Sequence, residues 1–560
     1  MRFLLLLLAF PALAQLPPAA APVVAAHALV VSAHPVASQV GRDILKQGGS
    51  AYDAAVAVQF ALAVVYPVAG NIGGGGFIVY RDHAGPAGTL DFRETAPAAA
   101  SRDMYLDKSG QVVPGLSTAG PLAVGTPGTV AGMDVLHKKL GKLPWAALVA
   151  PAVRLARRGV ALTAREAAGL NRTQADFTKY NPGAAPAFVR PAPWQPGDTL
   201  KQPELAAILE RIQNQGRAGF YQGETARLLL AQMRAGGGLI TQADLDQYQP
   251  KWREPLRGQY RGYEVITMPP PSSGGVALLQ MLQMLESFDL KKLGYHTPAA
   301  VGLLTEAERR AYADRATYLG DPDFGRVPVA QLLAKGYNQQ RARGIRPDAP
   351  ATPSAQVAAG AGLPRYESDQ TTHYSIVDAA GNAVSCTTTL NGAYGSKVVV
   401  AGAGFLLNNE MDDFSSKVGV PNMYGLVGGV ANAIAPGKRM LSSMTPTILV
   451  KNKKLALVTG SPGGSTIITS VLQSILAVVD YGANAQQAVA APRLHHQWLP
   501  DQLDAEAGAL TPAAEQTLRQ RGFNPQPRSP WGRLDIIRVL PSGALEGGAD
   551  PRGDDAAAGY

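Results

Sequence analysis

The first residue with evident chemical potential is a threonine at a change in sequence character. Thr371 is the third residue of the run DQTTHY, residues 369–374. Residues 345–366 are rich in Pro, Ala and Gly and lack a hydrophobic pattern, so we expect an exposed, flexible segment that is easily cut. A cut before Thr371 would leave a hydroxyl and a free α-amine, a nucleophile and a base, on one residue. The alternative is that Thr371 simply begins a strand, where threonine is favoured.

Two adjacent glycines form a second chemical feature. Gly463 and Gly464 lie between an expected strand over 455–459 and an expected apolar helix over 465–479. Backbone N–H groups at the start of a helix lack intrahelical partners and can stabilise an oxyanion, helped by the helix dipole. A plain strand-to-helix turn is the alternative.

A third feature combines both signs of charge with hydroxyl groups. Its members are Arg93, Asp412, Asp413, Ser442 and Ser443. Such a set suits the zwitterion of an amino acid. They could equally be separate solvated groups, because nothing in the sequence alone says that they meet in space.

Several common types of site are absent from the sequence. There is no H-E-x-x-H, and His495 and His496 are adjacent, so they cannot share one helical face for a metal. Neither a P-loop nor a G-x-S-x-G elbow is present. The glycine run 70–76 precedes an expected strand instead of opening a helix, so close backbone approach is its expected role. We therefore expect no cofactor and no metal.

Composition sets the broad class of the protein. The chain has 560 residues, 46% apolar and 17% charged, which is typical of a globular protein with one large or two intertwined domains. The net charge of +9 is modest, and no basic block with interleaved aromatic residues indicates nucleic-acid binding. The single cysteine, Cys386, excludes an intrachain disulfide; we expect a small buried side chain, the alternative being a nucleophile with a histidine beside it.

The N-terminus is typical of an export signal. Met1-Arg2 is followed by an apolar run over residues 3–10, too short to span a bilayer, and then by an A-x-A site at residues 12–14. We expect a signal peptide over residues 1–14, a mature chain from Gln15 without a membrane span, and a periplasmic or secreted location. An uncleaved signal anchor is the alternative.

Hydrophobic periodicity predicts layers of helices and strands with an antiparallel sheet. Strands are expected over 28–32, 77–80, 372–378, 383–389 and 398–407, and a hairpin over 445–450 and 455–459. Helices are expected up to residue 44, over 52–65 and through most of 120–345. The strand from residue 372 alternates roughly, as if half-buried.

The motifs around these features resemble those of the γ-glutamyltranspeptidases over nearly the whole mature chain. In the C-terminal part the matching runs are TTHY (371–374), LNNEMDDF (407–414), LSSM (441–444), GSPGG (460–464), RLHHQ (493–497) and DPR (550–552). In the N-terminal part they are GNIGGGGF (70–77), DFRE (91–94), MPPPSSGG (268–275) and YADR (312–315). Each motif alone is weak, and their number and order make the resemblance specific.

The resemblance implies an α+β fold, the N-terminal-nucleophile hydrolase αββα sandwich of two stacked antiparallel sheets flanked by helices. It also implies self-cleavage before Thr371 into a large subunit, residues 15–370, and a small catalytic subunit, residues 371–560, which remain together as a heterodimer. The activity implied is hydrolysis and transfer of the γ-glutamyl group of glutathione and related donors, through an ester on Thr371, to water or to amino-acid or dipeptide acceptors.

The resemblance also assigns site residues. Thr389 supports Thr371, and Gly463 and Gly464 hold the oxyanion. The donor's α-carboxylate falls to Arg93, Ser442 and Ser443, and its α-amine to Asn391, Glu410 and Asp413; a lid carries Tyr424, which can reach Asn391. Glu410 stands where some bacterial relatives have Gln, and both can accept a hydrogen bond from an ammonium. A glutaryl or cephalosporin acylase of the same fold, or an inactive processed relative used for binding, remains as an alternative.

Overall fold

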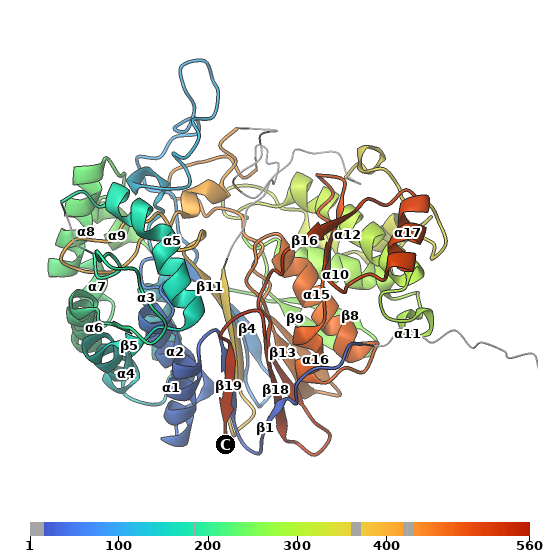
Figure 1. Cartoon of the computed structure of the whole chain (residues 1–560), viewed down its shortest axis with the longest axis horizontal. Coiled ribbons are helices and arrows are strands. Elements are labelled where there is room, and N and C mark those ends of the chain that lie inside the picture. Colours follow the sequence, from blue (N-terminus) through green and yellow to red (C-terminus); the bar gives the residue numbers. More distant parts are fainter. Residues whose placement is uncertain (1–15, 184–185, 360–370, 418–419, 421–422, 424–430) are drawn as a thin grey trace, which may run out of the picture.

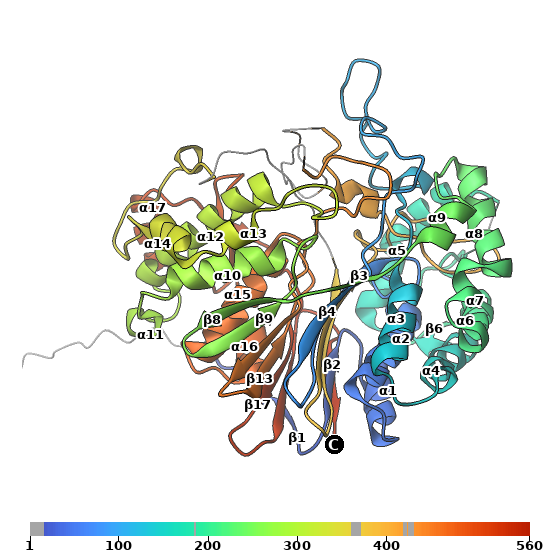
Figure 2. The ribbon, with the colours of Figure 1, turned by 180° about the vertical axis from the view of Figure 1, so that it is seen from behind.

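Two antiparallel sheets, stacked face to face and covered by helices on their outer sides, make up the protein (Figure 1, Figure 2). The computed structural model describes residues 16–183, 186–359, 371–417, 420, 423 and 431–560. The two stacked sheets and their outer helices confirm the expected αββα sandwich. The expected signal peptide lies outside the described residues, and within them no helix is long and apolar enough to cross a membrane.

Each sheet has seven strands. Sheet I runs in the order β1 (Val23–Ala25), β18 (Leu545–Ala549), β17 (Asp535–Val539), β13 (Lys454–Thr459), β12 (Thr447–Lys451), β9 (Tyr263–Thr267), β8 (Leu256–Tyr260). Sheet II runs in the order β19 (Ala556–Gly559), β2 (Leu29–Ser32), β10 (Thr372–Val377), β11 (Ala383–Thr389), β3 (Gly75–Arg81), β4 (Ala87–Asp91), β7 (Lys251–Arg253). Two small sheets pair β5 (Val160–Ala161) with β6 (Thr199–Leu200), and β15 (Leu503–Glu506) with β14 (Leu494–His495) and β16 (Pro525–Arg528).

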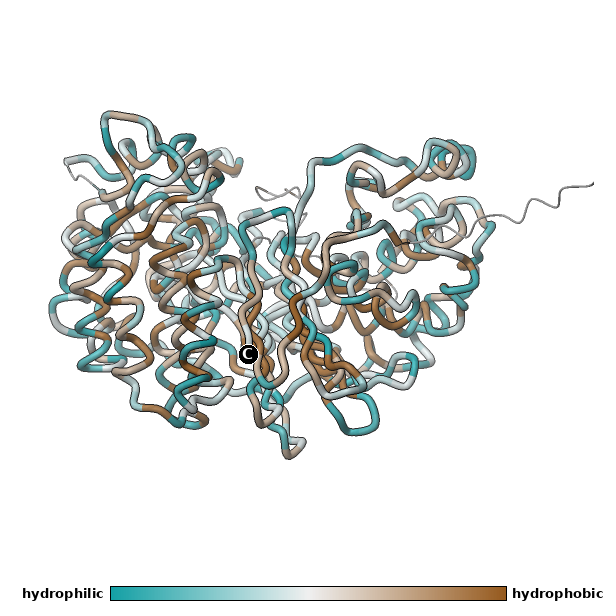
Figure 3. Tube along the Cα trace, turned by 60° about the horizontal axis from the view of Figure 1, so that its bottom comes forward, coloured by the Kyte–Doolittle hydropathy of each residue, from teal (hydrophilic) through white to brown (hydrophobic). Residues whose placement is uncertain are grey.

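The helices divide between the two outer faces (Figure 1). Beside sheet II lie α1 (Pro35–Lys46), α2 (Ala51–Val65), α3 (Thr129–Leu140), α4 (Trp145–Arg158), α5 (Ala164–Tyr180), α6 (Pro203–Gln215), α7 (Ala218–Tyr221), α8 (Gly223–Gly236) and α9 (Gln242–Gln247). Beside sheet I lie α10 (Gly274–Leu285), α11 (Leu290–Leu293), α12 (Pro298–Tyr318), α13 (Val329–Leu332), α14 (Lys335–Ala342), α15 (Thr466–Val479), α16 (Ala485–Ala490) and α17 (Pro512–Gln520). The hydrophobic residues concentrate in the strands and in the helices packed on them (Figure 3).

Helix α2 illustrates how the sequence specifies this packing. Ser50 caps its first turn in a reciprocal capping box with Asp53. Every residue from Ala51 to Val65 is buried, and such an all-round apolar helix belongs in a protein core. Its backbone carbonyl at Ala55 accepts a 3.2 Å hydrogen bond from the hydroxyl of Tyr374 on β10, so the helix is fixed against the centre of sheet II.

Strand β10 is buried on both faces, not on one as its rough alternation suggested. Tyr374 and Ile376 face α2 and its neighbours. On the other face, Ser375 donates a 2.8 Å hydrogen bond to the carbonyl of Asp535 in sheet I. The polar residues therefore lie between the sheets, where each must find a hydrogen-bond partner.

The glycine run 70–76 has the predicted role. A Cβ atom on Gly74 would lie 1.9 Å from the carbonyl oxygen of Thr389, and one on Gly75 would lie 2.5 Å from a carboxylate oxygen of Glu94. Only glycine permits this approach, which brings the end of β11 beside the residues after β4.

Three predictions about elements were wrong. Residues 398–407 form a loop with a single bridge between Val399 and Leu406, since Gly402 and Gly404 take positive φ values. Strands β7, β8 and β9 were missed within the region expected to be helical; they lie toward the sheet edges, where partial exposure weakens the alternating pattern. Residues 345–359 are not a free linker, because Ser354 is buried and bonded to Asp501 at 2.7 Å; residues 360–366 lie outside the described ranges.

Both sheets combine strands from before and after Thr371. Sheet I takes β1, β8 and β9 from the earlier part of the chain, and sheet II takes β10, β11 and β19 from the later part. Backbone hydrogen bonds between these strands would survive a cut before Thr371. Two chain pieces produced there should therefore remain one folded body.

Cys386 should be chemically inert in the native protein. It is fully buried on β11 opposite Tyr374, and burial raises the pKa of its thiol well above the ordinary value, so the reactive thiolate is suppressed. We expect iodoacetamide to leave the native protein unmodified but to alkylate the urea-unfolded protein, as followed by mass spectrometry. Cys386→Ser should fold and keep most of its activity. Rapid alkylation of the native protein, with loss of activity that the serine variant escapes, would indicate a functional thiol.

Candidate active site

Thr371 directly precedes β10, an inner strand of sheet II. Thr372 pairs with Thr388 in antiparallel register, so continuing that register places Thr371 opposite Thr389. Side chains alternate along a strand, which puts Thr371 on the same face as His373 and Ser375, toward sheet I. Thr371 is half-buried and lines a cavity of about 950 Å³.

The glycine turn between β13 and α15 reaches the same cavity. Gly463, with φ of 125°, lines it, and Gly464 follows with φ of 67°. These values lie in the region that favours glycine. Neither N–H donates a hydrogen bond to a described residue, so both are available for an anion. The turn can therefore serve as an oxyanion hole for a group bound to Thr371.

His373 connects the strand to this turn, a connection that the sequence did not indicate. Its ring nitrogens bond Thr387 at 2.9 Å and Ser375 at 3.1 Å. A Cβ atom on Gly460, at the end of β13, would lie 2.2 Å from the ring. Burial lowers the pKa of His373 to about 3, so the imidazole is neutral and fills the space between the sheets.

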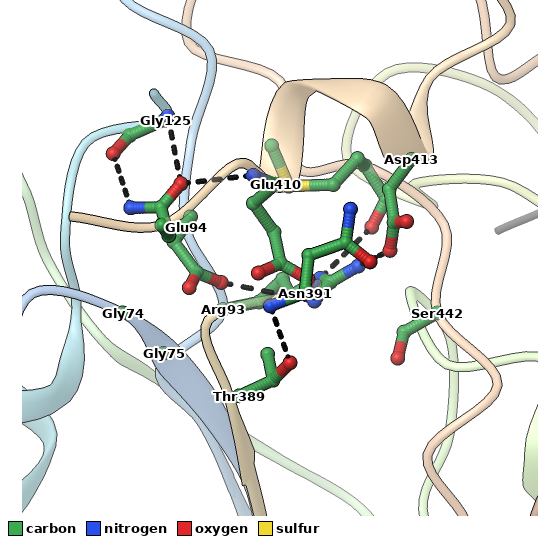
Figure 4. A network of polar contacts seen from close by, with 12 residues as sticks. Gly74, Gly75, Arg93, Glu94, Gly125, Thr389, Asn391, Glu410, Asp413 and Ser442 are labelled. Atoms are coloured by element: carbon green, nitrogen blue, oxygen red, sulfur yellow. Dashed lines mark hydrogen bonds and ion pairs between the residues drawn. The ribbon is translucent and has the colours of Figure 1, made fainter. Parts of the chain in front are cut away.

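A buried ionic cluster holds three of the predicted site residues (Figure 4). Arg93, just after β4, forms ion pairs with both Glu410 and Asp413 of the short 3₁₀ helix Glu410–Asp413. Its guanidinium also donates to the carbonyl of Leu441 at 3.1 Å. The three side chains come from segments more than 300 residues apart, and all are buried.

Glu94 is a fourth member that the sequence analysis did not single out. One of its carboxylate oxygens lies 3.8 Å from Arg93, and neither oxygen has a hydrogen-bond partner among the described residues. Burial raises the pKa of Glu94 to about 7, and it also raises the pKa values of Glu410 and Asp413. The DFRE run was the available signal, since Glu94 directly follows Arg93.

The charge balance of this cluster favours a further cation. Glu94, Glu410 and Asp413 contribute three carboxyl groups against the single guanidinium of Arg93. Buried carboxylates without enough positive charge take up protons or bind cations. Among the described residues no group of His, Cys, Asp and Glu is suited to a metal ion. An ammonium group is the cation that this set of oxygen atoms can accept through hydrogen bonds.

The two serines lie on a segment braced by the cis-proline turn before α10. The carbonyl of Ser442 accepts a 2.7 Å hydrogen bond from the N–H of Ser273, and the hydroxyl of Ser443 accepts one from Arg315. Ser442 lies beside the ionic cluster in Figure 4. Asp412, grouped with these residues in the sequence, instead bonds Ser117 at 2.5 Å and so stands apart.

Asn391 connects the end of β11 to the segment that carries the ionic cluster. Its N–H donates to the hydroxyl of Thr389 at 2.7 Å, and its side-chain amide donates to the carbonyl of Asn409 at 2.9 Å, next to Glu410. Its backbone has a positive φ of 68°, which asparagine tolerates better than most residues. Tyr424, its expected partner, lies outside the described residues.

The ionic cluster does not line the cavity that contains Thr371. Arg93 forms ion pairs with both Glu410 and Asp413, and none of the three is among the lining residues. A bound zwitterion would replace these contacts: its carboxylate would take the place of the acidic side chains on Arg93, and its ammonium would take the place of the guanidinium on the acids. The cluster thus contains a guanidinium that can pair with a carboxylate and carboxylates that can pair with an ammonium.

Comparison with known proteins agrees with the sequence motifs. The family model described as gamma-glutamyltranspeptidase matches residues 37–560. A glutathione hydrolase proenzyme of Pseudomonas sp. (strain A14) is 50% identical over 511 residues, 90% of this chain and 88% of the relative. The glutathione hydrolase proenzyme of Escherichia coli (strain K12) is 48% identical over 541 residues, covering 96% and 93%.

Among solved structures, a cephalosporin acylase from Bacillus halodurans superposes with a TM-score of 0.84 at 29% identity, covering 97% of this chain and 98% of its own. The match therefore extends through both sheets and both helical layers. The resemblance inferred from the motifs is confirmed, and the chain belongs to the gamma-glutamyltranspeptidase family.

Proposed function

We propose that the protein is a γ-glutamyltransferase and glutathione hydrolase, made as a precursor that cleaves itself before Thr371. The observation that carries this proposal is the buried cluster of one guanidinium and three carboxyl groups. Asn391 links it to Thr389, which lies opposite Thr371. A γ-glutamyl donor ends in a carboxylate and an ammonium on one carbon, and both need a buried partner of opposite charge.

Processing and catalysis use the same atoms. The Thr371 hydroxyl attacks the carbonyl carbon of Gln370, and the peptide C–N bond breaks, which frees the Thr371 amine. Water then hydrolyses the resulting ester, which frees the Gln370 carboxylate and the Thr371 hydroxyl. That amine then accepts the hydroxyl proton as the oxygen attacks the γ-carbonyl of the donor. The N–H groups of Gly463 and Gly464 stabilise the oxyanion, and the leaving amine departs with a proton. Water or an acceptor amine then cleaves the γ-glutamyl ester.

The remaining assignments follow from this mechanism. The products of processing are a large subunit, residues 15–370, and a small subunit, residues 371–560, held together by shared sheets. Arg93, Ser442 and Ser443 bind the donor's α-carboxylate, and Asn391, Glu410 and Asp413 bind its α-amine. Residues 1–14 direct export to the periplasm or medium. Thr389 supports the Thr371 hydroxyl, and Tyr424 closes over the donor.

Self-cleavage tests the role of Thr371. Purified protein should give two bands on a denaturing gel, with the smaller one beginning at Thr371. Thr371→Ala should remain whole because it lacks the attacking hydroxyl, whereas Thr371→Ser should still cleave. N-terminal sequencing that locates the cut at another residue contradicts the assignment.

The charge pairing is tested with two donors, one γ-glutamyl and one glutaryl p-nitroanilide. Arg93→Lys should lower kcat/KM for the γ-glutamyl donor, because Lys lacks the bidentate geometry. Asp413→Ala should lower kcat/KM more. The expected loss of binding free energy in the transition state is about 2–5 kcal/mol, as for a buried charge pair. Wild type should strongly prefer the γ-glutamyl donor, and Asp413→Ala should lose most of that preference.

Asp412→Asn is the matched control. Asp412 is the residue next to Asp413 and is also buried, but its carboxylate bonds Ser117 and not Arg93. It should keep the preference, and all three variants should self-cleave, since processing involves no donor. Equal use of both donors by the wild type would contradict an ammonium site and favour a glutaryl acylase.

Ligand binding should release protons near neutral pH. The raised pKa of Glu94, about 7, means that this carboxyl group is partly protonated near neutral pH in the free protein. A bound ammonium stabilises the carboxylate, lowers that pKa and expels the proton. Calorimetric titration with L-glutamate in buffers of different ionisation enthalpy should detect this release, and Glu94→Gln should reduce it. Glutarate, which lacks the ammonium, should release no protons. Proton uptake on glutamate binding would contradict the proposal that a bound ammonium lowers the pKa of Glu94.

A further inference from the structure

The cavity that contains Thr371 is rich in arginine. Arg165, Arg528, Arg533 and Arg552 line it, against a single lining carboxylate, Glu506. The donor's zwitterion is bound elsewhere, in the ionic cluster around Arg93. These guanidinium groups therefore face the part of the cavity left for the group attached through the scissile bond.

Two of the four arginines are held in place by carboxylates and other acceptors of the protein. Arg533 donates to Asp555 at 2.6 Å, to Ala33 at 2.8 Å and to the hydroxyl of Tyr66. Arg552 donates to Glu506 at 2.8 Å and to Asp550 at 3.1 Å, besides two backbone carbonyls. Both are largely buried and ion-paired, so they form the wall of the cavity.

Arg528 keeps one edge of its guanidinium available. At the end of β16, its Nη1 donates to Asp504 at 2.6 Å, while its Nε and Nη2 donate to no described residue. Its side chain is 41% exposed, and the guanidinium lies 5.3 Å from the centre of the Trp531 ring, another lining group. An available guanidinium edge is suited to a carboxylate, which it can grip bidentately.

The backbone beside Arg528 also supports the glycine turn. A Cβ atom on Gly463 would lie 3.0 Å from the Cα of Gly532, four residues after Arg528. The segment that carries Arg528 and Trp531 thus packs directly against the turn assigned to the oxyanion. This contact places the backbone that carries Arg528 close to the turn.

We propose that Arg528 binds a carboxylate on the amine side of the scissile bond, in the peptide that leaves the donor and in the amino acid or peptide that accepts the γ-glutamyl group. The inference rests on the proposed function. Leaving and accepting amines pass through the same position at the ester carbonyl, in opposite directions, so one site serves both. Substrates whose amine part carries a carboxylate are therefore selected over those that lack it.

The test uses two chromogenic donors that differ by one carboxylate, γ-glutamyl-4-nitroanilide and γ-glutamyl-3-carboxy-4-nitroanilide. Arg528→Ala should lower kcat/KM for the carboxylated donor by about 10-fold, equivalent to about 1.4 kcal/mol, and should change the uncharged donor by less than about 2-fold. Arg528→Lys should recover part of the loss as a point charge. Glycylglycine should accelerate cleavage of the γ-glutamyl ester less in Arg528→Ala than in the wild type. The effect of glycinamide, which lacks the carboxylate, should not change.

Arg257→Ala is the matched control. Arg257 is 45% exposed and its Nη1 bonds one carboxylate, Glu264, at 2.6 Å, but it lies on the edge strand β8, away from the cavity. It should leave both donors unaffected. Equal losses for both donors in Arg528→Ala, or no loss, would overturn the inference while leaving the proposed function intact. A wild type that cleaves neither donor would overturn both together.

Discussion

The pairing of β10 in the middle of sheet II is the constraint on which the site depends. The strand is hydrogen-bonded on both sides and buried on both faces, so a shift by one residue would exchange its two faces. Tyr374 would then leave its contact with α2, and His373 would leave the space beside Gly460. The register therefore fixes which side of the sheet Thr371 faces and sets it opposite Thr389.

Stacking of the two sheets then brings the turn of Gly463 and Gly464 to the cavity that Thr371 lines. The turn follows a strand of sheet I and Thr371 precedes a strand of sheet II, and the polar residues between the sheets connect them. Ser385 on β11, for example, donates to the carbonyl of Thr459 at 2.9 Å, the last residue of β13. Because these hydrogen bonds are buried, losing one leaves a costly unpaired group, which keeps the two halves of the site in a fixed relation.

Electrostatics governs the other half of the site. Several carboxyl groups are buried here with too few cations, and burial raises the pKa values of Glu94, Glu410 and Asp413. Such an arrangement costs folding free energy. Around Thr371 the balance is reversed, since arginines dominate the cavity wall. The two regions therefore differ in the sign of their excess charge.

The sequence by itself determined the family, the layered fold class and most elements, because capping residues, apolar runs and ordered motifs are local signals. Helix α2 and the hairpin of β10 and β11 were predicted nearly to the residue. Partial exposure hid the strands β7 to β9, and glycines with positive φ made a loop of an expected strand.

Only the tertiary structure decided that Arg93 meets Glu410 and Asp413, that Asp412 turns away to Ser117, that Glu94 joins the cluster, and that Arg528 faces the cavity of Thr371. Those contacts join segments far apart along the chain. They depend on how two sheets stack, which no local pattern encodes.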